Sequence, residues 1–545
     1  MAQYALGLDF GTNSVRALIV DCADGSELAT GVAQYSSGDE GVITDPKDHN
    51  LARQNPLDYH ASLDLAMQEA LKVARATGDF DAAHIVGIGV DTTGSTPMPT
   101  MYDGFPVAME EEFHDNTNAM AWLWKDHTAY AEAEEITDLA RKQGRPYLAK
   151  CGGTYSSEWF WSKILRAARL EPILVEGPTD TWMELCDFIP GYLCLEEAGQ
   201  VPRSVCAAGH KAMYSGEWGG LPDKDFLAAL HPALAGLRDR LYEKAYPSDR
   251  KAGGLAQAHA EKWGLRTGTP VAVGILDAHA GAVGSGVGPG RLVKIIGTST
   301  CDIMVASHVP DIPGVAGIVD GSVIPGMIGI EAGQSAVGDI FAWWSKVCGK
   351  SQEELAWDAS RLRAGESGLI ALDWNNGNRN VLADPLLSGL LVGQTLHTTA
   401  AEIYRALIEA TAFGALKIIQ RIEEHGVTIE DVVACGGIAE KSSMAMQIYA
   451  DVLNRPIRLS RCAQAPALGA AIFGSVVGSV HADVQTAQAA MTGFKDVQYL
   501  PDPIAVTVYA RLFELYEDLH DAFGLSDRFQ VMKDLIAVQK EARNG

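Results

Sequence analysis

The sequence predicts an α/β protein with two large domains, and three observations support this fold class. The chain has 545 residues, more than a single hydrophobic core normally serves. Short apolar runs typical of buried strands alternate with longer segments of helical periodicity. The pattern FGTNSVRALIV at 10–20 returns as IGTSTCDIMVA at 296–306, half a chain later. A repeat at this distance suggests two related domains, although a match this short also arises by chance.

The first third of the chain is predicted to form a core of strands with helices around it. Each expected strand is an apolar run bounded by turn residues, and Asp24-Gly25 is the expected hairpin turn between the second and third strands. The expected elements are strands at 4–10, 15–21, 28–35 and 84–91, and helices at 57–76, 119–142 and 157–170. Residues 171–260, rich in Gly, Pro and Trp, are interpreted as an insertion.

The second half shows a clearer alternation of strands and helices. Residues 268–290 are expected to form a strand, a polar turn and a helix of small residues. A long helix at 400–426 has apolar residues along one face and ends at Gly426, a residue typical of helix C-termini. The elements expected after it are a strand at 431–437, a helix at 442–454, a strand at 456–460, a helix at 466–478 and a helix pair beyond 503.

The composition argues against several classes of partner. The formal net charge is −26 and no basic stretch offsets it, which disfavours nucleic acid and anionic membranes. Nine cysteines without a C-x-x-C pair fit a reducing, cytoplasmic compartment. Neither a signal peptide nor an apolar run long enough to span a membrane is recognisable. We therefore expect a cytoplasmic protein that binds neither nucleic acid nor membrane.

Several common nucleotide-binding and catalytic motifs are missing from the sequence. Gly349-Lys350-Ser351 resembles the end of a P-loop, but Trp344 stands where the first glycine is required. The sequence has no G-x-G-x-x-G, no zinc-ligand spacing and no G-x-S-x-G elbow. A P-loop enzyme and a dehydrogenase of the Rossmann type are therefore disfavoured.

Four glycine-containing turns follow apolar strands. They are DFGTNS at 9–14, DTTGST at 91–96, IGTST at 296–300 and CGGIA at 435–439. Each alone is more often an ordinary turn, because Gly, Thr, Ser and Asn are common turn residues. Together they offer backbone N–H groups and hydroxyls of the kind that surround a polyphosphate. We therefore predict a phosphate-binding site formed by these turns.

With these turns, the chain resembles the FGGY carbohydrate kinases of the actin–hexokinase–chaperone ATPase superfamily along essentially its whole length. The segments that carry the resemblance are GLDFGTNSVRALIVD (7–21), IVGIGVDTTGSTP (85–97), LWKDHTA (123–129), YSSEWFWSKIL (155–165), AGHKAMYSGEWGGLP (208–222), KIIGTSTCDI (294–303), EAGQSAVGDIFAWW (331–344) and MQIYADVLNRPI (446–457). The resemblance implies two ribonuclease-H-like domains with an interdomain cleft. Residues 1–270 would form the sugar-binding domain and residues 271–545 the ATP-binding domain.

The resemblance also implies a reaction, namely transfer of a phosphoryl group from ATP, with Mg²⁺, to a sugar hydroxyl. AGHK at 208–211 and EAGQSAVGD at 331–339 point to L-ribulose as the sugar, converted to L-ribulose 5-phosphate in L-arabinose catabolism. The attacking alcohol needs a proton acceptor, and Asp277 in LDAHAG matches the family's catalytic base. A helix N-cap is the alternative role for Asp277. The nearby His279 is interpreted as a packing or orienting residue rather than a metal ligand.

The other site residues implied by the resemblance match family positions one by one. Asp9 matches the aspartate near Mg²⁺ and the transferred phosphate, and Lys441 stands where the family commonly has Asn. The implied contacts are Thr12, Asn13 and Ser14 in the first phosphate loop; Gly297 and Thr298 in the second; Gly436, Gly437 and Lys441 at the adenosine; and Ser95, Thr96, Lys211, Asp277 and Glu331 at the sugar. Arg16 is left open because it alternates with apolar residues, and Trp124, Lys125 and Asp126 are second candidates for the sugar site.

Three alternatives stay open at this point. The chain could be another FGGY kinase that acts on D-ribulose, xylulose or a polyol. An actin- or chaperone-like ATPase would hydrolyse ATP without sugar and would need a protein partner. A catalytically silent sugar sensor would be expected to lack the base or a phosphate loop. The expected ligands are a sugar and ATP, and the sequence leaves a homodimer undecided.

Overall fold

The computed structural model describes residues 2–177, 179–526 and 529–544. Contacts divide the chain into two compact units, and neither unit is a continuous stretch of sequence. Unit 1 consists of Met1–Gly286, Gly317–Gly329 and Gln464–Gly493. Unit 2 consists of Val287–Ala316, Ile330–Ala463 and Phe494–Gly545. The domain boundary expected at residue 270 stays a prediction, since both units are assembled from interleaved segments.

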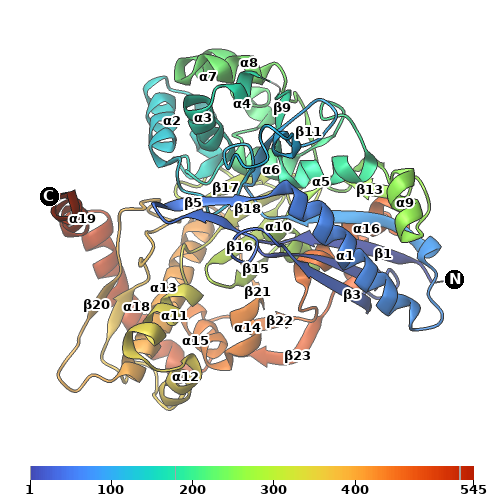
Figure 1. The fold of residues 1–545 in the computed structure, drawn as a ribbon. Coiled ribbons are helices and arrows are strands. Elements are labelled where there is room, and N and C mark those ends of the chain that lie inside the picture. The colour runs from blue at the N-terminus through green and yellow to red at the C-terminus, as the bar shows by residue number, and fades with distance from the viewer. Residues whose placement is uncertain (1, 178, 527–528, 545) are drawn as a thin grey trace. The chain divides into compact units, whose positions relative to one another are not determined.

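Unit 1 is built on a mixed sheet with the strand order β12-β13-β6-β1-β2-β3, and β14 also pairs with β6 (Figure 1). These strands are β1 (Tyr4–Phe10), β2 (Ser14–Asp21), β3 (Glu27–Gln34), β6 (Ile85–Thr92), β12 (Lys251–Gly254), β13 (Pro270–Ala272) and β14 (Ile275–Leu276). Strand β1 runs antiparallel to β2 and parallel to β6. The four strands expected in the first hundred residues are confirmed.

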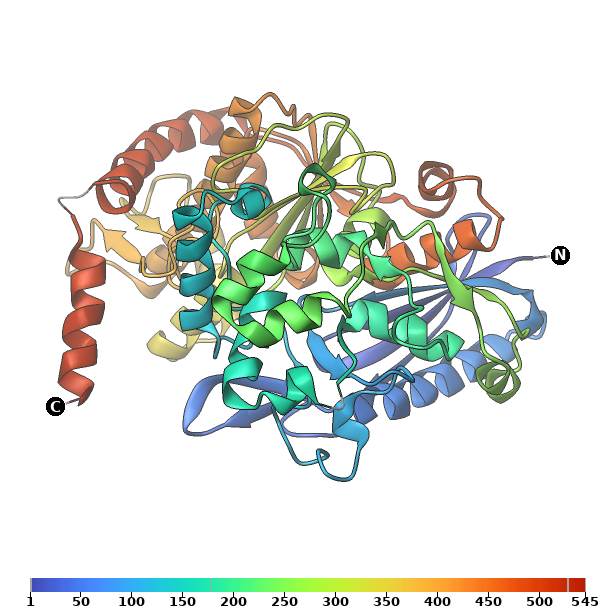
Figure 2. The ribbon, with the colours of Figure 1, turned by 90° about the horizontal axis from the view of Figure 1, so that it is seen from above.

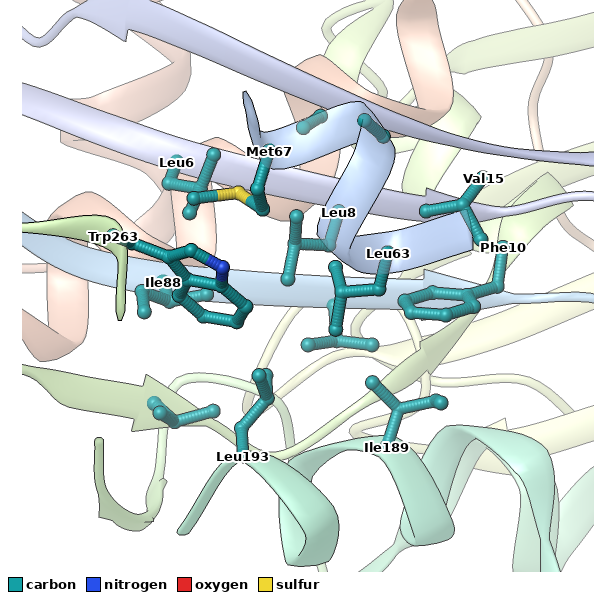
Figure 3. Close-up of a cluster of buried hydrophobic side chains, with 14 of the residues drawn as sticks. Leu6, Leu8, Phe10, Val15, Leu63, Met67, Ile88, Ile189, Leu193 and Trp263 are labelled. Carbon is teal, nitrogen blue, oxygen red and sulfur yellow. The ribbon is translucent and has the colours of Figure 1, made fainter. Parts of the chain in front are cut away.

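Helix α1 (Pro56–Arg75) covers one face of this sheet and runs beside the blue strands in Figure 2. Asn55 caps the helix by accepting a hydrogen bond from the backbone N–H of Leu57, and Pro56 fits the first turn, where no N–H donor is needed. The buried side chains between α1 and β1 include Leu6, Leu8, Phe10, Leu63 and Met67 (Figure 3). The amphipathic pattern at 57–76 is therefore explained by burial against β1.

Helix α16 (Ala465–Val477) covers the other face, and its backbone touches the strands directly. Residues on a strand alternate between the two faces, so Gly7 of β1 faces α16 while its neighbours face α1. A Cβ atom added to Gly89 of β6 would overlap the carbonyl oxygen of Ala470. Helix α10 (Asp277–Gly284) is packed on α16 in the same way, because a Cβ atom on Gly469 would overlap the carbonyl oxygen of Ala280.

Unit 1 has a second hydrophobic core with buried tryptophans, formed largely by helices α2, α3, α7 and α8; these helices lie close together in Figure 1. The remaining helices of the unit are α2 (Tyr130–Lys142), α3 (Phe160–Leu170), α4 (Ile173–Glu176), α5 (Leu185–Cys194), α6 (Val205–Lys211), α7 (Lys224–Leu230), α8 (Pro232–Arg238) and α9 (Gln257–Trp263), and α5 and α9 contribute to the core of the sheet instead. The smaller strands of the unit are β4 (Ile43–Asp45), β5 (Asp48–Gln54), β7 (Pro97–Thr100), β8 (Ala121–Trp122), β9 (Thr181–Glu184), β10 (Arg203–Ser204), β11 (Ala245–Tyr246) and β17 (Gly317–Asp320). Helix α17 (Val484–Met491) completes it.

The expectation of one helix over 119–142 is wrong for residues 119–129, which contain β8 and turns. The guanidinium of Arg53 lies over the indole of Trp122, 3.5 Å from the ring centroid. Asp126 forms a buried ion pair with Arg53 and accepts a hydrogen bond from the backbone N–H of Ala52 at 2.7 Å. These long-range contacts pair β8 with β5, and they outweigh the local helical pattern.

Unit 2 contains a second mixed sheet, in which the strands follow the order β18-β16-β15-β21-β22-β23. The strands of unit 2 are β15 (Arg291–Ile296), β16 (Thr300–Ala306), β18 (Ile328–Ala332), β19 (Ile370–Leu372), β20 (Leu390–Val392), β21 (Asp431–Cys435), β22 (Ile457–Ser460) and β23 (Phe494–Tyr499). Strands β19 and β20 pair with each other in a separate two-stranded sheet. Strand β15 runs antiparallel to β16 and parallel to β21, as β1 does with β2 and β6. The repeated pattern at 10–20 and 296–306 therefore forms the same hairpin arrangement in each unit.

The helices of unit 2 follow the sequence pattern closely. They are α11 (Gly338–Cys348), α12 (Gln352–Ser360), α13 (Ala400–Glu424), α14 (Gly437–Lys441), α15 (Ser443–Leu453), α18 (Pro503–Gly524) and α19 (Val531–Asn544). Thr399 and Glu402 form a capping box at the start of α13, and Gly426 adopts a φ of 84° just beyond its end. Within the described ranges, no helix of either unit is both long enough and apolar enough to cross a membrane.

The Gly89→Ala variant tests the close packing of α16. Its added methyl group must push α16 away from β6, so we expect the free energy of unfolding to fall by about 1–3 kcal/mol. Gly236→Ala in α8 is the control, because nothing lies within 4 Å of a Cβ atom added there and alanine favours helices. Urea unfolding followed by circular dichroism measures both. A midpoint for Gly89→Ala equal to that of the control would contradict the packing.

Candidate active site

Three aspartates come from neighbouring strands at one edge of the unit 1 sheet. Asp9 near the end of β1 is the register partner of Asp91 near the end of β6. Strand β14 also pairs with β6, with Leu276 opposite Thr92, so Asp277 follows directly at the same edge. The strand register thus brings Asp9 and Asp277, both predicted from the sequence, to the two sides of Asp91.

The electrostatics of this edge are dominated by burial and by an excess of carboxylates. Arg16, the register partner of Asp9 on β2, donates a hydrogen bond from Nη1 to Asp9 Oδ2 at 2.7 Å. Burial raises the pKa of Asp9, and the charge of Arg16 opposes that rise. Burial, followed by the negative charges of Asp9 and Asp277, raises the pKa of Asp91 well above its usual range. Because Arg16 offsets only part of this charge, the edge suits a bound cation or a retained proton.

Asp277 occupies the first turn of α10 rather than the N-cap position. The capping residue is Leu276, whose side chain makes no capping hydrogen bond. Asp277 Oδ1 accepts a hydrogen bond from the N–H of Ala278 at 2.6 Å, and the side chain is only partly buried. A carboxylate held in this way at a helix start is oriented by the backbone. The alternative N-cap role for Asp277 is therefore wrong.

The first predicted phosphate loop is the turn between β1 and β2. Trp124 donates its indole N–H to the hydroxyl oxygen of Thr12 at 3.0 Å, so that hydroxyl acts as an acceptor here. The side-chain amide of Asn13 donates to the carbonyl oxygen of Glu40 at 2.7 Å. Ser14 begins β2. Trp124 thus contacts the phosphate-loop turn, whereas the sequence left its role undecided.

The turn predicted to hold sugar, Gly94-Ser95-Thr96, is fixed by two buried residues that sequence reasoning missed. Glu184 on β9 accepts a hydrogen bond from the hydroxyl of Ser95 and another, at 2.7 Å, from the N–H of Thr96. Lys163 on α3 donates to the carbonyl oxygen of Ser95 at 2.9 Å. It also donates to the carbonyl oxygens of Trp122, the last residue of β8, and of Leu123, which follows it. These hydrogen bonds hold the buried turn in one geometry.

Lys211 ends α6 close to this network. Its ammonium lies 5.6 Å from the ring centroid of Trp159, and its positive charge acts on both Glu184 and Lys163. Burial raises the pKa of Glu184, while the Ser95 hydrogen bond and the two lysines oppose that rise. Burial also lowers the pKa of Lys163 to about 7. The predicted residues Ser95, Thr96 and Lys211 therefore belong to one buried polar group of unit 1.

The predicted adenosine and second phosphate residues come together at one edge of the unit 2 sheet. Gly297 and Thr298 follow β15, and Gly436 follows its parallel neighbour β21, with Ile295 and Cys435 in register. The three adjoining N–H groups at the start of α11 donate to the carbonyl oxygens of Gly297 and Thr298 at 2.7–3.2 Å. This second loop is therefore held from behind by the N-terminus of a helix.

The remaining predicted residues of unit 2 have simpler surroundings. Gly436 has a φ of 94°, and a Cβ atom there would lie 2.7 Å from the carbonyl oxygen of Ile296, so both conformation and space require glycine. Gly437 begins the short helix α14, and Lys441, which is exposed, ends it. Glu331 lies on β18, partly buried. Of the second candidates for sugar, Asp126 belongs to the ion pair with Arg53 described above.

Known proteins resemble this chain over most of its length. Residues 292–477 match the model of the FGGY family of carbohydrate kinases, C-terminal domain. The chain is 40% identical to the ribulokinase of Vibrio parahaemolyticus serotype O3:K6, with 95% of both chains covered. It is also 40% identical to the ribulokinase of Halalkalibacterium halodurans, with 98% of both chains covered. These likenesses confirm the resemblance that the sequence motifs indicated.

Solved structures share the fold. The crystal structure of xylulose kinase from Rhodospirillum rubrum superposes with a TM-score of 0.78 at 23% sequence identity, covering 96% of this chain and 99% of that chain. At this identity the comparison concerns the fold alone. The predicted α/β fold class of the actin and hexokinase type is confirmed.

Asp91→Asn is expected to gain stability relative to the wild-type protein as the pH rises. The raised pKa means that folded Asp91 keeps a proton that the unfolded chain releases above about pH 4, so wild-type stability is lost as the pH rises toward the folded pKa. Asparagine carries no such proton. Urea midpoints between about pH 5 and pH 8 measure the difference, with Asp225→Asn, an exposed carboxyl on α7, as the matched control. A pH-independent difference for Asp91→Asn would contradict this account.

Proposed function

The chain belongs to the FGGY family of carbohydrate kinases, and we propose that it transfers the γ-phosphoryl group of ATP to the terminal hydroxyl of L-ribulose, forming L-ribulose 5-phosphate. The names of the full-length relatives support ribulose as the substrate. The observation that carries the proposal is the carboxylate edge formed by Asp9, Asp91 and Asp277, because phosphoryl transfer needs both a proton acceptor and neutralisation of phosphate charge.

Asp277 is the proposed general base. Its carboxylate takes the proton of the terminal sugar hydroxyl while that oxygen forms a bond to the γ-phosphorus of ATP. The bond from the γ-phosphorus to the bridging oxygen breaks, and ADP leaves with the electron pair. Partial exposure and a position in the first turn of α10 support this role, because the side chain is accessible and the N–H of Ala278 orients its carboxylate.

Asp9, together with Asp91, is the proposed place for Mg²⁺. Carboxylate oxygens are the hard donors that this ion prefers, and the uncompensated negative charge of the edge fits a divalent cation. When bound, the ion supplies electrostatic neutralisation of the phosphate oxygens. Arg16 fixes one oxygen of Asp9 through its hydrogen bond, which orients the other oxygen of the same carboxylate.

The remaining assignments divide between sugar and nucleotide. We assign sugar binding mainly to residues 1–270 and ATP binding mainly to residues 271–545. The proposed sugar contacts are Ser95, Thr96, Lys211 and Glu331, and the proposed nucleotide contacts are Thr12, Asn13, Ser14, Gly297, Thr298, Gly436, Gly437 and Lys441. Charged and hydroxyl side chains suit a ketopentose, because each of its hydroxyls needs a hydrogen-bond partner once it leaves water. We place the reaction in L-arabinose catabolism in the cytoplasm, without dependence on a particular oligomeric state.

A coupled assay of ADP release over a panel of ketoses and polyols tests the proposed reaction. We expect the highest kcat/KM with L-ribulose and little ADP without sugar, and we expect Asp277→Asn to lower kcat by at least about 100-fold. Asp225→Asn is the matched control. A higher kcat/KM with D-ribulose, xylulose or glycerol would show that L-ribulose is not the preferred substrate. Hydrolysis of ATP without sugar would favour an actin- or chaperone-like ATPase. A kcat of Asp277→Asn close to that of the wild-type enzyme would contradict the proposal that Asp277 is the general base.

Glu184→Gln tests whether the buried network positions the sugar turn. Glutamine offers one acceptor oxygen where glutamate accepts from both Ser95 and Thr96, so the turn loses a hydrogen bond. We expect KM for sugar to rise about 10-fold, with a smaller change in kcat. Glu134→Gln, an exposed change on α2, is the control. A lowered unfolding midpoint with unchanged KM would assign Glu184 to stability alone.

A further inference from the structure

Three side chains of the kind that bind transition metals meet in the interior of unit 1. They are Cys206 and His210 of α6 and His279 of α10, and all three are buried. One potential ligand atom from each lies within 4.8 Å of the other two. Cys206 and His210 are four residues apart on one helix and so share a face. The proposed kinase reaction assigns no role to this cluster.

Hydrogen bonding prepares His210 to act as a ligand. Its Nε2 lies 3.1 Å from the hydroxyl oxygen of Ser322, which itself donates to the carbonyl oxygen of Val319 at 3.1 Å. Since the serine hydrogen is used in this way, the hydroxyl accepts from Nε2–H, and Nδ1 carries the lone pair. A histidine ligand commonly has its second nitrogen hydrogen-bonded in this manner. A Cβ atom on Gly317 would overlap Nδ1, so the backbone of this glycine packs directly against the His210 ring.

The position of His279 completes the cluster from a second helix. The rings of His210 and His279 are 4.4 Å apart at their centroids, with an interplanar angle of 49°. Ligand atoms bound to one zinc ion stand about 3.3–3.7 Å apart, given bonds of about 2.0–2.3 Å. Binding one ion would therefore draw ligand atoms that lie up to 4.8 Å apart closer together by about 1–1.5 Å.

We propose that Cys206, His210 and His279 form a binding site for a thiophilic divalent metal ion, with Zn²⁺ as the ion that matches their chemistry. One thiolate and two imidazoles are zinc ligands, and three protein ligands leave a fourth position open. The site differs from the carboxylate edge, because sulfur and nitrogen donors disfavour Mg²⁺. Binding releases the thiol proton of Cys206 as the metal–sulfur bond forms, so affinity rises with pH.

Metal binding here would link two helices that carry proposed substrate residues. Lys211 follows His210 at the end of α6, and Asp277 begins the helix that carries His279. An ion that binds the folded chain alone also raises its unfolding temperature by mass action. The site is therefore measurable without any assay of sugar turnover, and failure of the kinase assignment would leave the result unaffected.

The test uses the full chain after treatment with a chelator and gel filtration. Co²⁺ serves as a spectroscopic probe, and Zn²⁺ is then titrated to displace it. We expect one Co²⁺ per chain with the near-ultraviolet charge-transfer band of a thiolate ligand, loss of that band with Zn²⁺, and a higher unfolding temperature with Zn²⁺. Cys206→Ser and His210→Asn should lose the tight site. Cys194→Ser, which changes a buried cysteine of α5 outside the cluster, should keep it.

Two results would overturn the proposal. The first is Co²⁺ binding to the wild-type chain without a thiolate band, or no binding at all. The second is Zn²⁺ affinity in Cys206→Ser equal to that of the wild-type chain, which would place the ion elsewhere. Should Cys206→Ser fail to fold by circular dichroism, the wild-type spectrum and the His210→Asn variant still decide between these outcomes.

Discussion

The backbone of α16 is the surface against which the carboxylate edge of unit 1 packs. Strand β1, strand β6 and helix α10 each approach it so closely that a Cβ atom on the glycine at the contact would overlap backbone atoms. These are the elements that carry Asp9, Asp91 and Asp277. Dense packing of this kind transmits small displacements, because backbone atoms in contact have no side chain between them that could rearrange. The relative positions of the three carboxylates therefore depend on a helix that contributes none of them.

Burial of charge destabilises the carboxylate edge and raises the pKa values of Asp9 and Asp91. Strand register forces Asp9 and Asp91 side by side in a region from which water is excluded, and Arg16 compensates one of them. A carboxylate that remains without compensation raises its pKa or binds a cation. Asp277 differs because it sits at a helix start and is only partly buried. One edge thus holds two buried carboxyl groups beside a third that is partly exposed.

Sequence reasoning located the parts of the site that lie at strand ends. Asp9, the turn at 91–96 and Asp277 each follow an apolar run, and strand register then places them together. Glu184 and Lys163 were missed because their partners, Ser95 and Thr96, are far away in the chain, and a lone charged residue is usually solvated. A signal was present in both cases, since Lys163 interrupts WFWSKIL and Glu184 interrupts TWMELCDF, two largely apolar runs. The wrong helix at 119–129 has the same cause, because Arg53 holds that segment from a distance.

Residues 464–493 belong to unit 1 although they follow a long segment of unit 2 in the sequence. This order affects how unit 1 folds during synthesis. Domains of a large protein generally fold as units while synthesis proceeds from the N-terminus. Here the glycine face of β1 and β6 stays uncovered until α16, almost 400 residues after β6, has left the ribosome. Residues 1–286 therefore reach their native sheet packing only after residues 464–493 have been synthesised. During that interval, exposed strand surface is open to aggregation, and chaperone binding would have its greatest effect.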